Sequence, residues 1–317
     1  MLSLDAPLVA VLWQEALSRA HHVKLLPGCN LALGLAVWLI YIVDRVLDGC
    51  GASRSEILSP RHAFYRRHRI WLIALVIPAL AAWLLYVALW VIPADIMWRG
   101  AALAFLVGVY LLHYSVHRRQ RLLFLAGNAV LCLMGLAVLL LFPLPLPVQL
   151  LYGLVLVVIL AQSLLGRQNS VPKEFLCGYL FALGCGLSVR YLSLDTYAGP
   201  FSPETMMLAL LFALNCVAIS CYERKTDRTF DPGAIFQIWP GVARVYPLLL
   251  LSLAVFSVLT IRQAFSKDIL AFGGAVFLST LLLGALHYFS KRISADLARV
   301  LADAALVLPI LVIFIAP

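Results

Sequence analysis

Long apolar segments separated by short polar segments repeat along the whole chain. Each apolar segment approaches the roughly 20 residues that a helix needs to cross the hydrocarbon core of a bilayer. Backbone polar groups have no water to pair with at that depth, so each segment is predicted to be a helix. The pattern predicts eleven spans, near residues 6–25, 28–48, 70–92, 98–117, 121–142, 147–165, 173–192, 204–222, 242–261, 268–289 and 296–316.

The first of these segments has the weakest pattern. Gln14, Glu15 and Arg19 interrupt it, so either a full crossing or a short, partly buried helix is consistent with it. The longest polar stretch, residues 49–69, has the length of a loop. We therefore expect a single transmembrane domain over residues 1–317, all-α, a polytopic transmembrane helical bundle of about nine to eleven spans.

The composition excludes a soluble globular domain. Apolar residues make up 63% of the 317 residues, charged residues make up 12%, and the mean hydropathy is +0.98. Soluble domains contain about 45–50% apolar and about 25% charged residues. The sequence thus predicts an integral, multi-pass protein, and we expect it in a bacterial inner membrane.

Basic residues gather in the loops that follow even-numbered spans. The residues concerned are Arg54, Arg61, Arg66, Arg67, Arg69, Arg118, Arg119, Arg121, Arg167, Lys173, Arg224, Lys225, Arg228, Lys291 and Arg292. The positive-inside rule places these loops and the N-terminus in the cytoplasm, with the C-terminus outside. The formal charge of +9 is explained by this rim next to anionic lipid headgroups, so nucleic-acid binding is not expected.

Two pairs of acidic residues lie at span ends on the predicted cytoplasmic side. Asp44 and Asp48 end the second span, and Glu223 and Asp227 end the eighth. Residues four apart share one face of a helix. Two facing pairs would supply hard oxygen ligands of the kind that Mg²⁺ takes together with substrate phosphates. Solvated charges at helix ends are the alternative interpretation.

Basic residues accompany both acidic pairs. The segment PRHAFYRRHR follows the first pair, and Arg224 lies within the second. Carboxylates can bind a metal ion, and guanidinium groups beside them can bind oxygen anions. Together they form the arrangement expected for a diphosphate site. The seven cysteines include no CxxC pair and lie mostly in apolar spans, so we interpret them as small packing residues.

Three stretches resemble the UbiA-type intramembrane prenyltransferase superfamily. That superfamily carries NDxxDxxxD at the end of its second helix and DxxYxxxD or DxxDxxxD on a later helix. Here the corresponding stretches are residues 40–48 and 216–227, and residues 171–184 (VPKEFLCGYLFALG) are similar to the helix before the second motif. The deeper carboxylates are replaced, because Tyr41 and Cys216 stand where the motifs have aspartate.

The resemblance implies Mg²⁺-assisted transfer of an isoprenyl group from an isoprenyl diphosphate to a lipophilic or aromatic acceptor. The residues it assigns to catalysis and metal binding are Asp44, Asp48, Glu223 and Asp227. Those it assigns to substrate binding are Arg61, Arg66, Arg67, Lys173, Arg224, Tyr41 and Asn215. The alternative is a catalytically degenerate relative that binds or carries a polyprenyl chain or another lipid.

Overall fold

A computed structural model describes most of the chain, and its regular structure is entirely helical there. The described residues are 4–51, 60–115, 121–141, 146–165, 172–193, 200–222, 234–263 and 266–315. The long helices are α1 (Asp5–Ala20), α2 (Cys29–Gly51), α5 (Ile77–Trp90), α6 (Ala94–Tyr114), α7 (Arg121–Leu141), α8 (Leu146–Leu165), α9 (Lys173–Leu192), α10 (Pro203–Tyr222), α13 (Val242–Arg262), α14 (Lys267–Phe289) and α15 (Ala295–Ile315). The short ones are α3 (Pro60–Arg67), α4 (Arg69–Trp71), the π-helical turn η1 (Leu72–Val76), α12 (Ile235–Ile238) and the 3₁₀ turn η2 (Ser290–Arg292).

Seven apolar segments in the described part of the chain are long enough to cross a membrane. They are α2, α6, α9, α10, α13 and α14, together with the continuous segment Arg69–Trp90 that joins α4, η1 and α5. The all-helical, multi-pass prediction is therefore confirmed.

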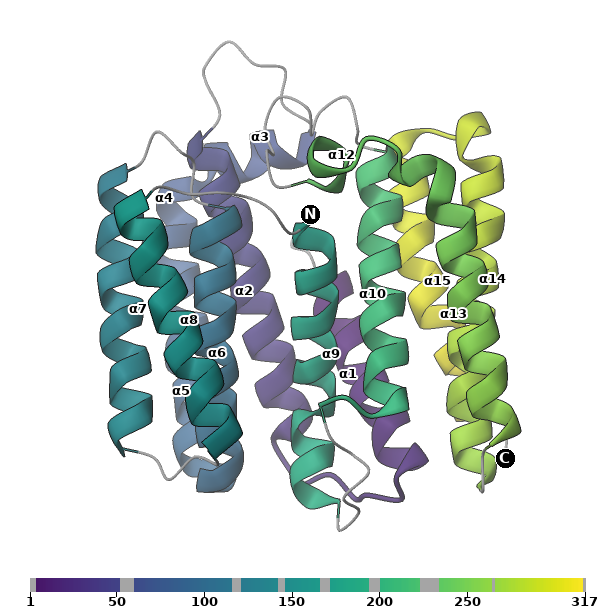
Figure 1. Cartoon of the computed structure of the whole chain (residues 1–317), viewed down its shortest axis with the longest axis horizontal. Coiled ribbons are helices and arrows are strands. Elements are labelled where there is room, and N and C mark those ends of the chain that lie inside the picture. The colour runs from purple at the N-terminus through teal and green to yellow at the C-terminus, as the bar shows by residue number, and fades with distance from the viewer. Residues whose placement is uncertain are drawn as a thin grey trace.

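Successive long helices run in opposite directions, so their ends meet at two faces of the bundle (Figure 1). The end of α2, the end of α10, α3 and α12 lie at one face, which we call the motif face. The helix ends that flank the basic loops after even-numbered spans all lie at this face. The basic loops were predicted to alternate with less basic ones along the chain, and this order matches the alternating directions of the helices.

Helix α1 is short and packs with one face against α2, α9, α14 and α15. Its 16 residues would extend about 24 Å at 1.5 Å per residue, less than the roughly 30 Å hydrocarbon core. Val9, Ala10 and Trp13 are at most 4% exposed. Of the two interpretations that the sequence left open for this segment, the structure favours the short, partly buried helix, since Leu8 on its other face is 52% exposed.

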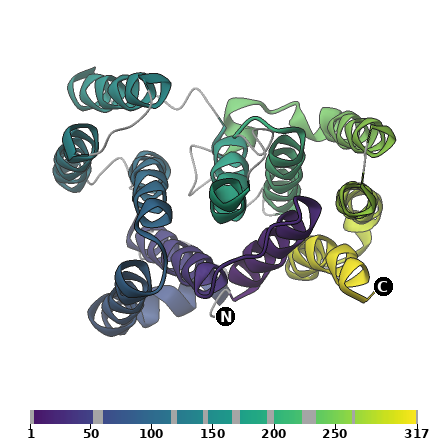
Figure 2. The ribbon, with the colours of Figure 1, turned by 90° about the horizontal axis from the view of Figure 1, so that it is seen from below.

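Helices α9 and α10 occupy the middle of the bundle. Figure 2 shows them between α5 to α8 at one end and α13 to α15 at the other, with α1 and α2 along one side. Their backbones approach closely at Gly178, where an added Cβ would lie 2.5 Å from the backbone nitrogen of Ala213. Small residues at such a crossing allow membrane helices to pack backbone to backbone. This pair is the scaffold on which the site below is built.

Candidate functional site

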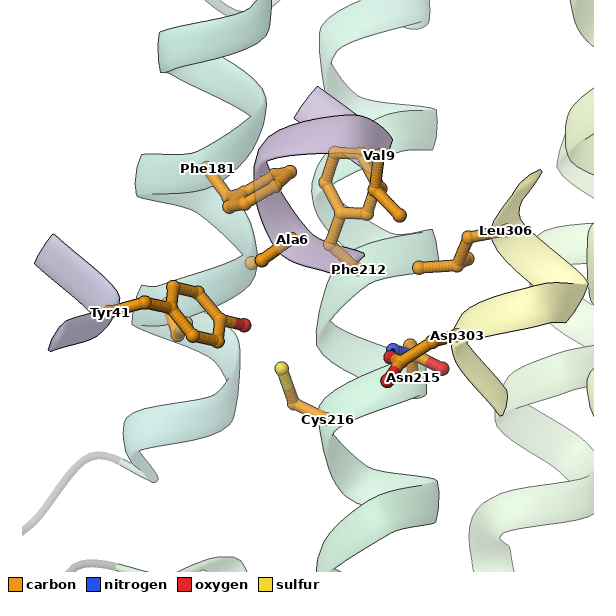
Figure 3. Close-up of a pocket in the computed structure, with 11 residues that line it drawn as sticks. Ala6, Val9, Tyr41, Phe181, Phe212, Asn215, Cys216, Asp303 and Leu306 are labelled. Carbon is orange, nitrogen blue, oxygen red and sulfur yellow. Dashed lines mark hydrogen bonds between the residues drawn. The ribbon is translucent and has the colours of Figure 1, made fainter. Parts of the chain in front are cut away.

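A polar cavity lies at the junction of α1, α2, α9, α10 and α15. Its polar lining comes from Tyr41 on α2, Cys177 on α9, Asn215 and Cys216 on α10, and Asp303 on α15. Figure 3 shows the Tyr41 hydroxyl and the Cys216 sulfur pointing into the space between these helices. The cavity volume is about 40 Å³, which is room for about three water molecules or one small polar group.

The remaining walls of the cavity are apolar. Phe181 and Phe212 pack edge to face with ring centroids 4.7 Å apart, and Leu306 and Val9 cover other sides. Asn215 lies seven residues before the end of α10, about 10 Å below the motif face at 1.5 Å per residue. The polar lining is thus enclosed among apolar side chains at membrane depth.

Helix α10 brings Cys216 against Cys177 of α9 because the two helices cross so closely. The two thiols are in hydrogen-bonding contact, and Cys177 also contacts the hydroxyl of Tyr110 from α6. Cys185, by contrast, is fully buried, as expected for a packing residue. The packing interpretation of the cysteines is therefore incomplete for Cys177 and Cys216, which line the cavity as polar groups.

Asp44 lies next to this cluster, three residues after Tyr41 on α2. Its Oδ1 accepts a hydrogen bond of 2.5 Å from the Ser115 hydroxyl at the end of α6. Its charge also acts on Cys177 and Tyr110. The first acidic motif therefore contributes one carboxylate between the cavity and the motif face, held in place by α6.

Lys173 begins α9 at the motif face. Its ammonium group acts electrostatically on Cys177 and Cys216, so its charge reaches the cavity. The adjacent Glu174 is 1% exposed and accepts hydrogen bonds from the Ser220 hydroxyl (2.8 Å) and the backbone N–H of Ile235 (3.0 Å). Glu174 thereby ties the start of α9 to the end of α10 and to α12.

Helix α3 carries the basic segment that follows the first acidic pair. Tyr65 is 1% exposed and packs with Ile42 and Val46 of α2, which docks α3 along the end of that helix. Arg66 on α3 is half-buried and Arg67 is exposed. The sequence-predicted cations are thus at the same face of the bundle as Asp44 and Lys173.

Five predicted site residues cannot be placed as side chains. Glu223, Arg224 and Asp227 lie outside the described residues. Asp48 and Arg61 belong to α2 and α3, but their side chains lie outside the described part of the structure. Whether the two acidic pairs face each other therefore stays a prediction.

Besides Cys177 and Cys216, the sequence-based set of site residues lacked Asp303, Ser115 and Glu174. Asp303 could have been selected from the sequence, because an ionisable residue in the interior of an apolar span marks a functional position by default. Ser115 and Glu174 could not have been selected in this way, since a serine or a glutamate at a span end is usually solvated.

Comparisons with known proteins identified no relative of the chain. No protein-family model, no curated protein and no solved structure matches the chain.

Proposed function

We propose that the chain is an intramembrane prenyltransferase that resembles the UbiA type and transfers an isoprenyl group from a diphosphate to a lipophilic or aromatic acceptor. The observation that supports this most is the meeting of the two motif-bearing helices at one polar cavity. Tyr41 comes from the first motif and Cys216 from the second, with Asn215 beside it.

The charged groups around the cavity suit a diphosphate at the motif face. Lys173 and Arg66 are cations at that face, and Asp44 supplies a carboxylate next to the cavity. Carboxylate oxygen is the ligand type that Mg²⁺ prefers, and Asp48 follows one turn later on α2. Mg²⁺ bound by Asp44 and Asp48, with Glu223 and Asp227, would neutralise charge on the diphosphate.

The residues around the cavity would have different roles in this reaction. Arg66, Arg67 and Lys173, with Arg61 and Arg224, would bind the diphosphate oxygens. The isoprenyl chain would lie between helices and face lipid, where an apolar chain needs no water. Tyr41 presents an aromatic ring at the cavity, and such rings attract the positive charge that develops on an allylic carbon.

The test is a thermal-shift measurement with geranylgeranyl diphosphate on detergent-purified protein, with and without Mg²⁺. A ligand that binds only the folded state stabilises it by about 2.7 kcal/mol at 100 times its Kd. We expect Mg²⁺-dependent stabilisation that Asp44→Asn removes. Asp296→Asn is the matched control, because Asp296 is an exposed acid at the same face with a side chain 71% exposed.

A second candidate function is lipid binding without diphosphate cleavage. Tyr41 and Cys216 line the cavity at the positions where the resembled motifs have carboxylates, and neither supplies a formal charge for a metal ion. If this candidate is right, geranylgeraniol will stabilise the protein as much as the diphosphate does. The stabilisation will then be independent of Mg²⁺ and unchanged in Asp44→Asn.

A further inference from the structure

Asp303 is a carboxylate in the interior of α15, the helix of the last span that the sequence predicts. It lies eight residues after Ala295, so about 12 Å along α15 from the motif face. It lines the cavity from the side of α15 and acts electrostatically on Tyr41. Ionisable residues at membrane depth are costly and usually bind substrate, ions or protons.

Asn215 pairs with this carboxylate and leaves one atom unsatisfied. Its Nδ2 donates to Asp303 Oδ1 at 3.4 Å, an orientation that follows from chemistry because only the amide nitrogen can donate to a carboxylate. The side chain is 5% exposed, and its Oδ1 is buried without a hydrogen-bond partner. A buried carbonyl oxygen of this kind calls for a donor, and the cavity is the space from which a ligand can supply one.

The two acceptor oxygens lie in a cavity with apolar walls. Phe181, Phe212 and Leu306 line the same space as the carboxylate of Asp303 and the amide of Asn215. A divalent cation would leave net positive charge among these walls, which is unfavourable in a medium of low dielectric. A neutral hydroxyl group adds no charge and offers the donor hydrogen that Asn215 Oδ1 lacks.

We propose that Asp303 and Asn215 form a subsite for the hydroxyl group of a lipophilic acceptor. This assignment rests on the proposed transferase function and names the class of its second substrate. The cavity of about 40 Å³ takes the hydroxyl end, and the apolar remainder of the acceptor extends between the helices.

Asp303 is then the base of the transfer step. The acceptor oxygen forms a bond to C1 of the isoprenyl group, and the bond between C1 and the diphosphate oxygen breaks. The diphosphate leaves with that electron pair, and the hydroxyl proton passes to the Asp303 carboxylate. Asn215 orients the acceptor, because its Oδ1 accepts the hydrogen bond of the bound hydroxyl until the proton passes to Asp303.

The binding test compares 1-decanol with its methyl ether, in which a methyl group replaces the donor hydrogen. Thermal-shift titrations of the detergent-purified protein give the two apparent Kd values. We expect the alcohol to bind about 10- to 100-fold more tightly, the range of one hydrogen bond to a charged group. Asp303→Asn should reduce this preference about tenfold, and Asp296→Asn on the same helix should leave it unchanged.

A second variant and an activity assay complement the binding test. If Asp303→Asn does not fold, Asn215→Leu tests the same preference by removing the other acceptor. With geranylgeranyl diphosphate and 1-decanol, Asp303→Asn should lower the rate of ether formation at least about 100-fold. The Mg²⁺-dependent stabilisation by the diphosphate should remain, because Asp303 lies below that site.

The outcomes separate the two proposals. Equal affinity of alcohol and ether in the unmodified protein means that the cavity holds only water, and it overturns the subsite. An unchanged preference for the alcohol over the ether in Asp303→Asn also overturns the subsite. A preference for the alcohol without any stabilisation by geranylgeranyl diphosphate supports the subsite and rejects the transferase.

Discussion

At the scale of single residues, Trp13 shows how an unpaired polar atom is tolerated in the core. Its ring is fully buried, with edge-to-face contacts to Phe212 (6.2 Å) and Phe272 (5.7 Å). The indole Nε1 has no hydrogen-bond partner. Packing therefore keeps this residue in place and hydrogen bonding does not, in contrast to Asn215, whose unpaired atom lies at a cavity.

We expect Trp13→Ala to lower the free energy of unfolding by about 3–5 kcal/mol, because it removes a large ring from a closed site. Trp13→Phe should cost less than about 1.5 kcal/mol, since the ring contacts largely remain and the unpaired N–H disappears. Unfolding in mixed detergent micelles measures both. Trp71→Ala is the control: that side chain is 69% exposed, and surface changes usually stay within about 0.5 kcal/mol. Equal losses for Trp13→Ala and Trp71→Ala would contradict the prediction.

At the scale of elements, the crossing of α9 and α10 sets the geometry of the cavity. Gly178 allows the backbones to approach, and Cys177 and Cys216 meet beside it. Glu174 adds a polar link from α9 to Ser220 and to α12. A change in the separation of these two helices would therefore move most of the polar lining.

Gly178→Ala should destabilise the protein by about 1–3 kcal/mol, the usual cost of overpacking, because the new Cβ would lie 2.5 Å from a backbone nitrogen. Gly274→Ala on α14 is the matched control, since a Cβ there meets nothing within 4 Å. It should be neutral or stabilise by about 0.5–1 kcal/mol through helix propensity. Thermal unfolding of both variants compares them, and a stable Gly178→Ala protein would show that the crossing can open without cost.

At the scale of the whole molecule, the alternation of helix directions brings the helix ends that flank the basic loops to the motif face. The positive-inside rule then predicts one orientation in the membrane, with the motif face in the cytoplasm. The proposed function requires the same orientation if the diphosphate is drawn from the cytoplasm.

Epitope insertion into the full-length protein tests this orientation. An epitope inserted after Gln263, between α13 and α14, should be accessible to antibody on intact bacterial spheroplasts. One inserted between Gly51 and Pro60 should become accessible only after permeabilisation, because that segment follows α2 at the motif face. The reverse pattern would place the motif face outside and would remove the basis for a cytoplasmic donor.

The sequence by itself determined the helical class and the order of the helices. This was possible because the bilayer imposes its requirements locally: a span needs enough consecutive apolar residues and must satisfy its own backbone. The spacing of the acidic residues selected Asp44, and the family resemblance added Tyr41, Lys173 and Asn215. In the structure Tyr41 and Asn215 line the cavity, and Asp44 and Lys173 act electrostatically on Cys177 in its wall.

Only the tertiary structure decided which spans meet. It packed one face of α1 against the core and closed α9 on α10, and it set Asp303 against Asn215, 88 residues away in the chain. Lipid is as apolar as the side chains, so hydropathy carries no information about which helix faces which neighbour. Contacts between distant spans depend on the shapes of small residues and on a few polar pairs, and these acquire meaning only after the helices have packed.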